Sequence, residues 1–332
     1  MKSSGLGVGI IGPGAIAAVH ARAVLALGHH VAAVAGPDRR QADAFGNTFS
    51  CPRVYDRAEQ LVADDTVDAV IVASPNRLHV EHTELALKAG RPVLSEVPVA
   101  TSLPAALGLQ ATAAAADQWV MVAHTLRYLE GPRKLRELVE SEGFQIAHLS
   151  ARRLLRRQTN TGWTGQPRAW TDQIWWHHGA HLLDATLWLL DTTSVEISGR
   201  LGGKWARTGE PMDAAAVLST MDGRLAGLTL SYHSQLPVDE FVAINENHTY
   251  LLREGRLVNG DSTVTPTGLS PADELEAAVR VQDAAFLQAV ANRTRPPIEL
   301  ADVMPTIRLL QHVQDDADLQ QSQGCERADA AL

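Results

Sequence analysis

A glycine-rich turn near the start of the chain constrains the fold more than any other feature of the sequence. The apolar run 8–11 is followed by Gly12-Pro13-Gly14-Ala15-Ile16-Ala17, a G-x-G-x-x-A pattern that opens a helical stretch. In a dinucleotide-binding unit the first Gly permits the tight turn, the second admits the pyrophosphate, and the small third residue lets helix pack on strand. We expect Gly12, Gly14, Ala15 and Ile16 to bind a dinucleotide at the helix N-terminus. The alternative is a plain glycine-rich turn.

Short apolar runs alternate with helical stretches over residues 6–123. Strand-like runs lie at 7–11, 31–35, 69–73, 92–95 and 119–123, and helical stretches lie at 15–27, 40–45, 80–89 and 104–116. Apolar strands that alternate with helices indicate a parallel sheet covered on both faces. We therefore expect an α/β fold in which residues 1–124 form a doubly wound Rossmann domain.

The hydrophobic pattern changes after residue 124. Residues 195–258 alternate with period two and carry turn residues such as Met221-Asp222-Gly223, which indicates a mainly antiparallel open sheet. Helical periodicity appears at 133–142, 171–190, 272–292 and 301–314. We expect residues 125–332 to form an α+β substrate domain, with the helix near 301–314 packing back on the first domain.

Composition limits the classes of partner. The 332 residues carry a formal net charge of -9, and an acidic chain is poorly suited to binding nucleic acid. No apolar run reaches the roughly 18 residues that a membrane span needs. The two cysteines, Cys51 and Cys325, lack the spacing of a zinc site. We expect a cytoplasmic protein that binds neither nucleic acid nor membrane, and whose substrate is small and anionic.

The end of the second predicted strand indicates which dinucleotide binds. Strand tips of NAD sites usually carry an acidic residue for the ribose 2′-hydroxyl, and here that tip is Gly36. Arg39 and Arg40 follow, and guanidinium groups pair well with a 2′-phosphate. This favours NADP. Asp38 keeps NAD as the alternative, and the arginines are alternatively a solvated helix start.

Two further segments give the chain a family resemblance. They are Ser74-Pro75-Asn76-Arg77-Leu78-His79 and Gly90-Arg91-Pro92-Val93-Leu94-Ser95-Glu96-Val97-Pro98. With the glycine motif, they resemble the glucose-fructose oxidoreductase/inositol dehydrogenase (Gfo/Idh/MocA) family over nearly the whole chain. The resemblance implies an NAD(P)-dependent dehydrogenase acting on CH–OH groups, and a homodimer or homotetramer. It also implies a cofactor site lined by Ser74, Pro75, Asn76, His79, Glu96 and Pro98.

The chain departs from the family pattern at two positions. The usual Glu-Lys-Pro is Glu96-Val97-Pro98, and the first Asp of Asp-x-Gly-x-His-x-x-Asp is His177. Both departures resemble one branch of the family, which oxidises the cyclic hemiacetal of 4-carboxy-2-hydroxymuconate-6-semialdehyde to a pyrone dicarboxylate. The likeness extends to His124-Thr125-Leu126-Arg127, Arg156-Arg157, Pro167-Arg168-Ala169-Trp170-Thr171-Asp172 and Trp176-His177-His178. By it, His124, Arg127, Arg168, Trp170 and Asp172 are candidate substrate-binding residues.

Histidines supply the candidate catalytic groups. On a helix, His177, His181 and Asp184 share one face, while His178 points elsewhere. We interpret His181 as the leading general base and His177 as the second, because neutral imidazole can accept a hydroxyl proton near neutral pH. Asp184 or Asp172 would orient an imidazole, although Asp184 is alternatively a structural contact. No third metal ligand is evident, so we expect no metal.

The basic residues fit a carboxylated substrate. Arg127 and Arg168 are the first candidates for bidentate pairing with carboxylates, and Trp170 is a candidate for stacking on a flat ring. A hemiacetal also needs less help than a simple alcohol, which suits the absence of the lysine at Val97. Two alternatives remain: a sugar or inositol dehydrogenase of the same fold, and a non-catalytic NADP-binding regulator. In each case we expect the nicotinamide to face the imidazoles of the second half of the chain.

Overall fold

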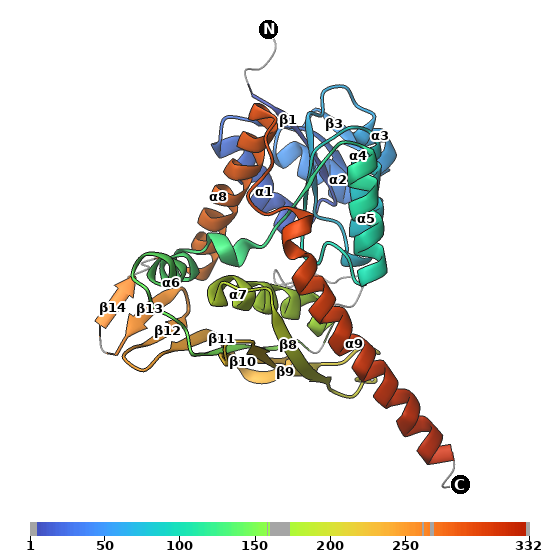
Figure 1. Cartoon of the computed structure of the whole chain (residues 1–332). Helices are drawn as coiled ribbons and strands as arrows, with labels where there is room; N and C mark the ends of the chain where they lie inside the picture. The colour runs from blue at the N-terminus through green and yellow to red at the C-terminus, as the bar shows by residue number, and fades with distance from the viewer. Residues whose placement is uncertain (1–4, 158, 160–172, 261, 266–268, 330–332) are drawn as a thin grey trace. The chain divides into compact units, whose positions relative to one another are not determined.

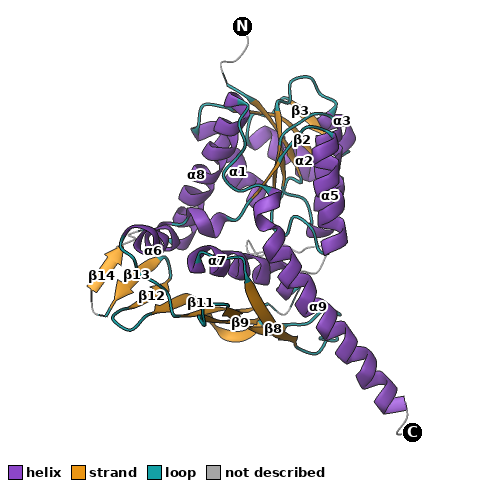
Figure 2. Cartoon of the chain, in the orientation of Figure 1, coloured by secondary structure: helices purple, strands orange, loops and turns teal. Residues whose placement is uncertain are grey.

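The computed structural model describes residues 5–157, 159, 173–260, 262–265 and 269–329 (Figure 1). The chain divides into two compact units. The first contains residues 1–129 and 269–304, and the second contains residues 130–268 and 305–332. Figure 2 shows that helices and strands alternate in the first unit, whereas the second gathers its strands into one sheet. No helix in the described part of the chain is long and apolar enough to span a membrane.

A parallel sheet forms the centre of the first unit. Its six described strands pair in the order β3-β2-β1-β4-β5-β6. Their bounds are β1 (Gly7–Ile11), β2 (His30–Ala35), β3 (Arg53–Tyr55), β4 (Ala69–Val72), β5 (Val93–Ser95) and β6 (Val120–Val122). This order is that of the dinucleotide-binding doubly wound fold, in which the switch point falls between β1 and β4. The predicted fold class is confirmed.

Helices cover both sides of this sheet (Figure 1). They are α1 (Ala15–Ala26), α2 (Arg39–Thr48), α3 (Ala58–Val62), α4 (His79–Lys88), α5 (Leu103–Ala115) and α8 (Pro271–Asn292), with 3-10 turns η1 (Asn76–Leu78) and η2 (Thr125–Tyr128). In Figure 1, α1 and α8 lie on one side and α4 and α5 on the other. The sequence pattern missed β3 and α3, because three and five residues are too few to establish a period.

Helix α8 belongs to the first unit, which corrects the predicted boundary at residue 124. Phe286 and Leu287 of α8 are buried in one hydrophobic core with Val8 and Ile10 of β1. Val279 packs against α1 in a second cluster. A helix that buries its apolar face against a sheet belongs to that core, wherever it falls in the sequence. The boundary lies at Leu129, and the chain returns to the first unit at Leu269.

The second unit contains an open, mainly antiparallel sheet. Its eight described strands pair in the order β14-β13-β12-β11-β7-β10-β9-β8, and β7 and β10 run parallel. Their bounds are β7 (His148–Arg156), β8 (Val195–Leu201), β9 (Asp213–Thr220), β10 (Leu225–Ser231), β11 (His233–Ile244), β12 (Thr249–Arg253), β13 (Arg256–Asn259) and β14 (Ser262–Thr265). Helices α6 (Glu130–Ser141) and α7 (Ala180–Leu190) lie over one face (Figure 1).

Helix α9 (Leu300–Asp329) runs further than the predicted 301–314. From Pro305 onward it groups with the second unit. The carbonyl oxygen of Leu310 accepts a hydrogen bond from the Trp175 indole at 2.9 Å. Residues 300–304 of α9 therefore belong to the first unit and the rest of the helix to the second, and the packing of this helix on the first domain stays a prediction.

Candidate active site

The turn between β1 and α1 has the shape that a pyrophosphate needs. Gly12 has a φ of +96°, and a Cβ there would lie 2.6 Å from the Ser74 Cα. Only glycine fits this position. At Gly14 a Cβ would meet no atom of the described chain within 4 Å, so the fold itself does not require glycine there. The open space at Gly14 is consistent with the approach of a ligand.

The N-terminus of α1 adds the electrostatic part of this site. Gly14 is the N-cap, no side chain caps the helix, and its first turn, which includes Ala15 and Ile16, contains no acidic residue. The first amides of a helix have no intrahelical acceptor, and the helix dipole favours an anion there. The four predicted pyrophosphate residues therefore come together in one turn.

At the tip of β2, the structure separates the two candidate arginines. Arg39 pairs with Asp43 at 2.9 Å and with Asp56 at 3.5 Å. Asp38 accepts from the amides of Arg40 and Gln41, so its carboxylate caps α2. The exposed Arg40 guanidinium makes no ion pair or hydrogen bond within the described residues. Of the pair, Arg40 keeps its guanidinium available.

His79 connects two segments that the sequence assigned to the cofactor. The ring is buried, and its two nitrogens lie 2.7 Å from the carbonyl oxygens of Ser74 and Pro98. Burial lowers its pKa. Pro75 and Asn76 follow Ser74 into η1 and are half-buried. His79 therefore fixes the backbone beside the predicted cofactor site, and its ring nitrogens face protein atoms.

Glu96 directly follows β5, and its carboxylate contacts a buried histidine. Its Oε1 lies 2.8 Å from Nε2 of His20, a fully buried residue of α1. Val97, at the position of the family's lysine, is 3% exposed and precedes a cis peptide bond to Pro98. The departure from Glu-Lys-Pro thus places an apolar side chain in the core of the first unit.

In the second unit, His177 and His178 lie on a π-helical turn, η3 (Trp175–Gly179), which continues into α7, where His181 lies. Gly179 packs against the Trp175 ring, since a Cβ there would lie 2.8 Å from Cε3 of the indole. π-turns widen the helix and recur at functional sites. The helical prediction for residues 180–190 is confirmed, whereas residues 175–179 form a π-turn and not the expected α-helix.

The π-turn and the first turn of α7 bring three imidazoles together. The ring centroids of His177 and His178 are 4.5 Å apart, and those of His177 and His181 are 5.9 Å apart. His178, which the helical spacing directed elsewhere, lies beside His177 because the π-turn holds more residues per turn. Asp184 lies fully buried in α7. His177, His178 and His181 are called the histidine cluster below.

Basic and aromatic residues of the second sheet surround His178. Nη1 of Arg153 lies 3.5 Å from its Nδ1, and the ring centroid of Tyr232 is 5.5 Å from that of His178. The guanidinium of Arg157 lies 5.3 Å from the centre of the Tyr232 ring. Burial and the neighbouring His177 and Arg153 hold the pKa of His178 well below its ordinary value. His178 is therefore a neutral imidazole beside two guanidinium groups.

Adjacent arginines of β7 lie on opposite faces of the sheet. Arg152 pairs with the buried Glu240, which also pairs with Arg253. Arg153, one residue later, is 12% exposed, contacts His178 and pairs with Asp239 at 2.6 Å. The alternation along a strand explains the difference. Sequence reasoning gave Arg153 and Arg157 no leading role and missed Tyr232, although the period-two pattern of β7 separates adjacent arginines.

The other predicted substrate residues are distributed over the chain. His124, buried, and Arg127, half-buried, belong to the first unit, at the end of β6 and in η2. Arg168, Trp170 and Asp172 lie outside the described residues. Among the residues described, no group of three or more His, Cys, Asp or Glu side chains is arranged to hold a metal ion.

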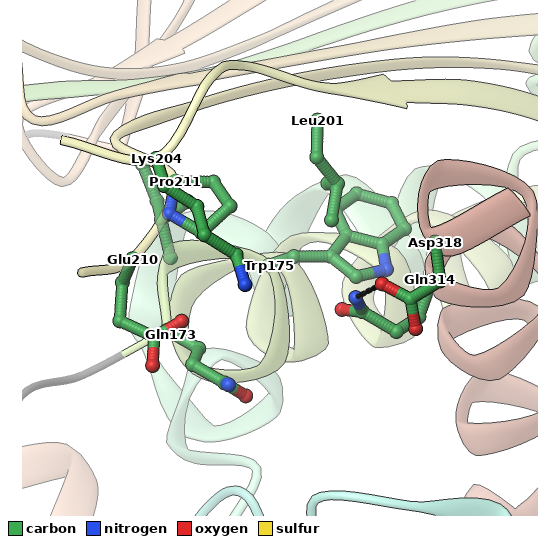
Figure 3. Close-up of a pocket in the computed structure, with 9 residues that line it drawn as sticks. Gln173, Trp175, Leu201, Lys204, Glu210, Pro211, Gln314 and Asp318 are labelled. Carbon is green, nitrogen blue, oxygen red and sulfur yellow. Dashed lines mark hydrogen bonds between the residues drawn. The ribbon is translucent and has the colours of Figure 1, made fainter. Parts of the chain in front are cut away.

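The second unit contains a pocket whose lining includes none of the three histidines (Figure 3). It is lined by Trp175, Leu201, Lys204, Glu210 and Pro211 together with Gln173, Ile174, Gln314 and Asp318. The Gln314 amide and Asp318 are joined by a hydrogen bond in its wall. None of the residues predicted to take part in catalysis or cofactor binding lines it.

The fold and the glycine turn define a class of protein, the dinucleotide-dependent oxidoreductases. Comparison with known families is specific: residues 6–124 match the oxidoreductase family with the NAD-binding Rossmann fold, and residues 132–268 match the C-terminal domain of bacterial oxidoreductases. The chain belongs to this Gfo/Idh/MocA family of oxidoreductases. It is an NAD(P)-dependent dehydrogenase acting on CH–OH groups, as the sequence predicted.

Characterised relatives differ in substrate. The chain is 28% identical, over 77% of its length and 80% of the relative's, to 4-carboxy-2-hydroxymuconate-6-semialdehyde dehydrogenase of a Sphingobium species. It is 27% identical to inositol 2-dehydrogenase of Corynebacterium glutamicum, over 70% and 69% of the two chains. An Agrobacterium radiobacter oxidoreductase, solved with NAD+, L-tartaric acid and magnesium, shares the fold. Its TM-score is 0.83, with 20% identity over 95% of this chain and 97% of that one.

Proposed function

We propose that the protein oxidises a carboxylated cyclic hemiacetal to a lactone, with NADP as the hydride acceptor. The observation that carries the proposal is the position of Arg153 and Arg157 around the histidine cluster. Guanidinium groups suit the carboxylates of such a substrate, and an imidazole suits its hydroxyl. The likeness to a dehydrogenase of a carboxylated semialdehyde supports the same substrate class.

The residues of the histidine cluster would have different roles toward the substrate. We assign the general base to His181, with His177 as the second candidate, because each has an imidazole suited to taking a hydroxyl proton. When bound, the nicotinamide would accept a hydride from the carbon that carries this hydroxyl. Neutral His178 and Arg153 would hold a carboxylate of the substrate, and the buried Asp184 would fix the first turns of α7.

The chemistry of a hemiacetal compensates for the valine at position 97. The hydroxyl of a hemiacetal is more acidic than that of a simple alcohol, because the carbon carries a second oxygen. The ring oxygen also stabilises the carbon that loses hydride, and ester resonance stabilises the product. A site without the family's lysine is therefore adequate for this substrate and poorly suited to an inositol.

Arg40 supports the choice of NADP. It follows the tip of β2, where the ribose of the adenosine half binds in this fold, and its guanidinium is exposed. Arg39, by contrast, pairs with two carboxylates. We therefore assign the 2′-phosphate contact to Arg40, and expect Arg40→Ala to raise the KM for NADP at least tenfold and that for NAD less than twofold.

The test of the proposal is a substrate panel. Purified protein is given NADP or NAD with the ring-cleavage semialdehyde of protocatechuate, myo-inositol or glucose, and the absorbance at 340 nm is followed. We expect turnover of the semialdehyde with NADP to exceed that of both neutral substrates at least a hundredfold. Faster turnover of inositol would replace the proposal with the inositol dehydrogenase alternative. Tight NADPH binding without any turnover of carboxylated substrates would favour a regulator.

A further inference from the structure

A buried imidazole joins two carboxylates within the first unit. His20 Nε2 lies 2.8 Å from Oε1 of Glu96, and its Nδ1 lies 2.8 Å from Oδ2 of Asp283. The three residues come from α1, the segment after β5, and α8. His20 and Asp283 are fully buried, and the Glu96 side chain is 14% exposed. Three elements distant in the sequence therefore meet at one ring.

The geometry fits an imidazole whose two ring nitrogens both donate. A carboxylate oxygen only accepts, so an imidazole between two carboxylates forms both bonds when it carries two protons. Although burial opposes the charge, the two carboxylates raise the pKa of His20 to about 10. Charged hydrogen bonds in a buried site are directional and stronger than neutral ones. His20 is thus a rigid link between Asp283 and Glu96.

The far end of the link is also anchored. Gln282 lies within 3.4 Å of Asp283 through its amide nitrogen, and its amide oxygen accepts from the Thr125 hydroxyl at 3.0 Å. Gln282 and Asp283 are fully buried in α8. The exposed end of the chain of contacts is therefore the Glu96 carboxylate, which lies where β5 ends.

The position of Glu96 indicates what the link serves. In a sheet of this order, ligands bind beyond the carboxyl ends of the strands, and each half of the sheet holds one mononucleotide. The glycine turn after β1 and Arg40 after β2 mark the adenosine half. Glu96, after β5, lies on the other half, which would hold the nicotinamide.

We propose that His20 is a positioning residue, which holds the Glu96 carboxylate and with it residues 95–98 in the shape that binds the nicotinamide half of the cofactor. This inference rests on the cofactor placement of the proposed function and is independent of the substrate. Loss of the Glu96–His20–Asp283 bridge would therefore weaken binding of the complete dinucleotide. Binding of its adenosine fragment alone would be unaffected.

Two substitutions separate the two bonds of the imidazole. The amide nitrogen of Gln corresponds to Nε2, so His20→Gln keeps a donor toward Glu96. The amide nitrogen of Asn corresponds to Nδ1, so His20→Asn keeps the donor toward Asp283 and releases Glu96. Dissociation constants are measured by titration with NADPH and its adenosine fragment 2′,5′-ADP, and in parallel with NADH and 5′-ADP. Because no substrate is present, the result is distinct from that of the substrate panel.

We expect His20→Asn to bind the better of the two dinucleotides at least tenfold more weakly, while its matching fragment binds within twofold of the unchanged protein. His20→Gln should bind both within threefold. Equal losses for dinucleotide and fragment, equal losses in the two variants, or no loss in His20→Asn would overturn the proposal.

A double-variant cycle tests whether His20 acts through Glu96. Glu96→Ala leaves the buried pair of His20 and Asp283 in place, so the core is retained. If the proposal holds, the variant with both Glu96→Ala and His20→Asn binds NADPH no more weakly than Glu96→Ala alone, within twofold. Independent, multiplied losses would contradict it. If His20→Asn does not fold, Asp283→Asn replaces it, with a three- to tenfold loss for the dinucleotide expected and no loss counting against the proposal.

Discussion

At the scale of residues, the histidine cluster separates candidates for the base from a neutral neighbour. His178 is kept neutral by burial and by the adjacent His177 and Arg153. His181 lies at the first turn of α7 and directs its ring toward His177 across 5.9 Å. The three imidazoles are thus unequal in environment, which makes their roles separable by substitution.

The base assignment predicts a large kinetic effect. We expect His181→Ala to lower kcat about 10²- to 10⁴-fold, the usual contribution of a general base, with the dissociation constant for NADPH unchanged. His177→Ala, at the neighbouring imidazole, is the matched control and should lower kcat less. Steady-state kinetics with the semialdehyde check this. A larger loss in His177→Ala would transfer the assignment to His177.

Adjacent arginines on β7 provide a test of carboxylate binding. Arg153→Gln should raise the KM for a carboxylated substrate about 10- to 100-fold, which corresponds to about 1.4 to 2.7 kcal/mol of lost binding. Arg152 pairs with Glu240 on the other side of the sheet, so Arg152→Gln should leave the KM within twofold. KM and kcat are measured for both. Equal increases of KM in the two variants would show that the loss comes from disturbance of β7 and not from a lost contact between Arg153 and the substrate.

At the scale of elements, the turn from β1 to α1 distinguishes a glycine required by the fold from one left for the ligand. Gly12→Ala would force a methyl group to within 2.6 Å of Ser74 and keep a strained φ, at a cost of about 2 to 4 kcal/mol. Gly14→Ala meets no protein atom in the described chain, so its Tm should stay within about 2 °C. Its affinity for NADPH should nevertheless fall at least tenfold.

Thermal unfolding and NADPH titration of the two variants check this prediction. A stable Gly12→Ala would contradict the steric argument. A Gly14→Ala variant with unchanged affinity would show that the pyrophosphate lies elsewhere.

Local sequence signals predicted the elements of the first sheet because period and turn chemistry are properties of neighbouring residues. The strand at residues 7–11 and the helix that begins at Ala15 follow directly from them. Two features depended on distant partners. The Trp175 indole, at the start of the π-turn, donates to the carbonyl oxygen of Leu310, 135 residues away, and α8 joins the first unit because its apolar face meets α1 and β1. Neither partner is visible in a local window.

The same distinction applies to the candidate site. The cofactor glycines were predictable from their order in the chain, whereas Arg39 and Arg40 look alike in sequence and differ only through the partners of Arg39. His20 gave no signal, because its two carboxylate partners lie 76 and 263 residues away. Buried charge networks are therefore the part of this site that required a structure.

At the scale of the whole molecule, the buried bridge couples the stability of the first unit to pH. The pKa of His20 rises from the ordinary 6.5 to about 10 on folding, through Asp283 and Glu96. A basic group whose pKa is raised by folding stabilises the folded state fully below the unfolded pKa, and this contribution is lost as pH rises toward the folded value. The stabilisation by His20 should therefore decline between about pH 6.5 and pH 10.

Asp283 and Tyr128 are further titratable groups in the core of the first unit. Burial raises the pKa of Asp283 above its ordinary value. Tyr128, which interacts with Asp283, has its pKa raised to about 12 by burial, above the window. The decline between pH 6.5 and pH 10 is therefore assigned to the coupled His20–Asp283 pair.

Urea unfolding at several pH values tests the coupling. The unchanged protein should be more stable than His20→Gln by about 2 to 4 kcal/mol near pH 6.5, and the difference should shrink steadily toward pH 10. His233→Gln, at a half-exposed histidine paired with Asp213 in the second unit, is the control and should show a small difference. A difference for His20→Gln that stays constant across the range would mean that the imidazole is neutral in the folded protein. In that case one of the two carboxyl groups is protonated, and the imidazole donates to one partner and accepts from the other.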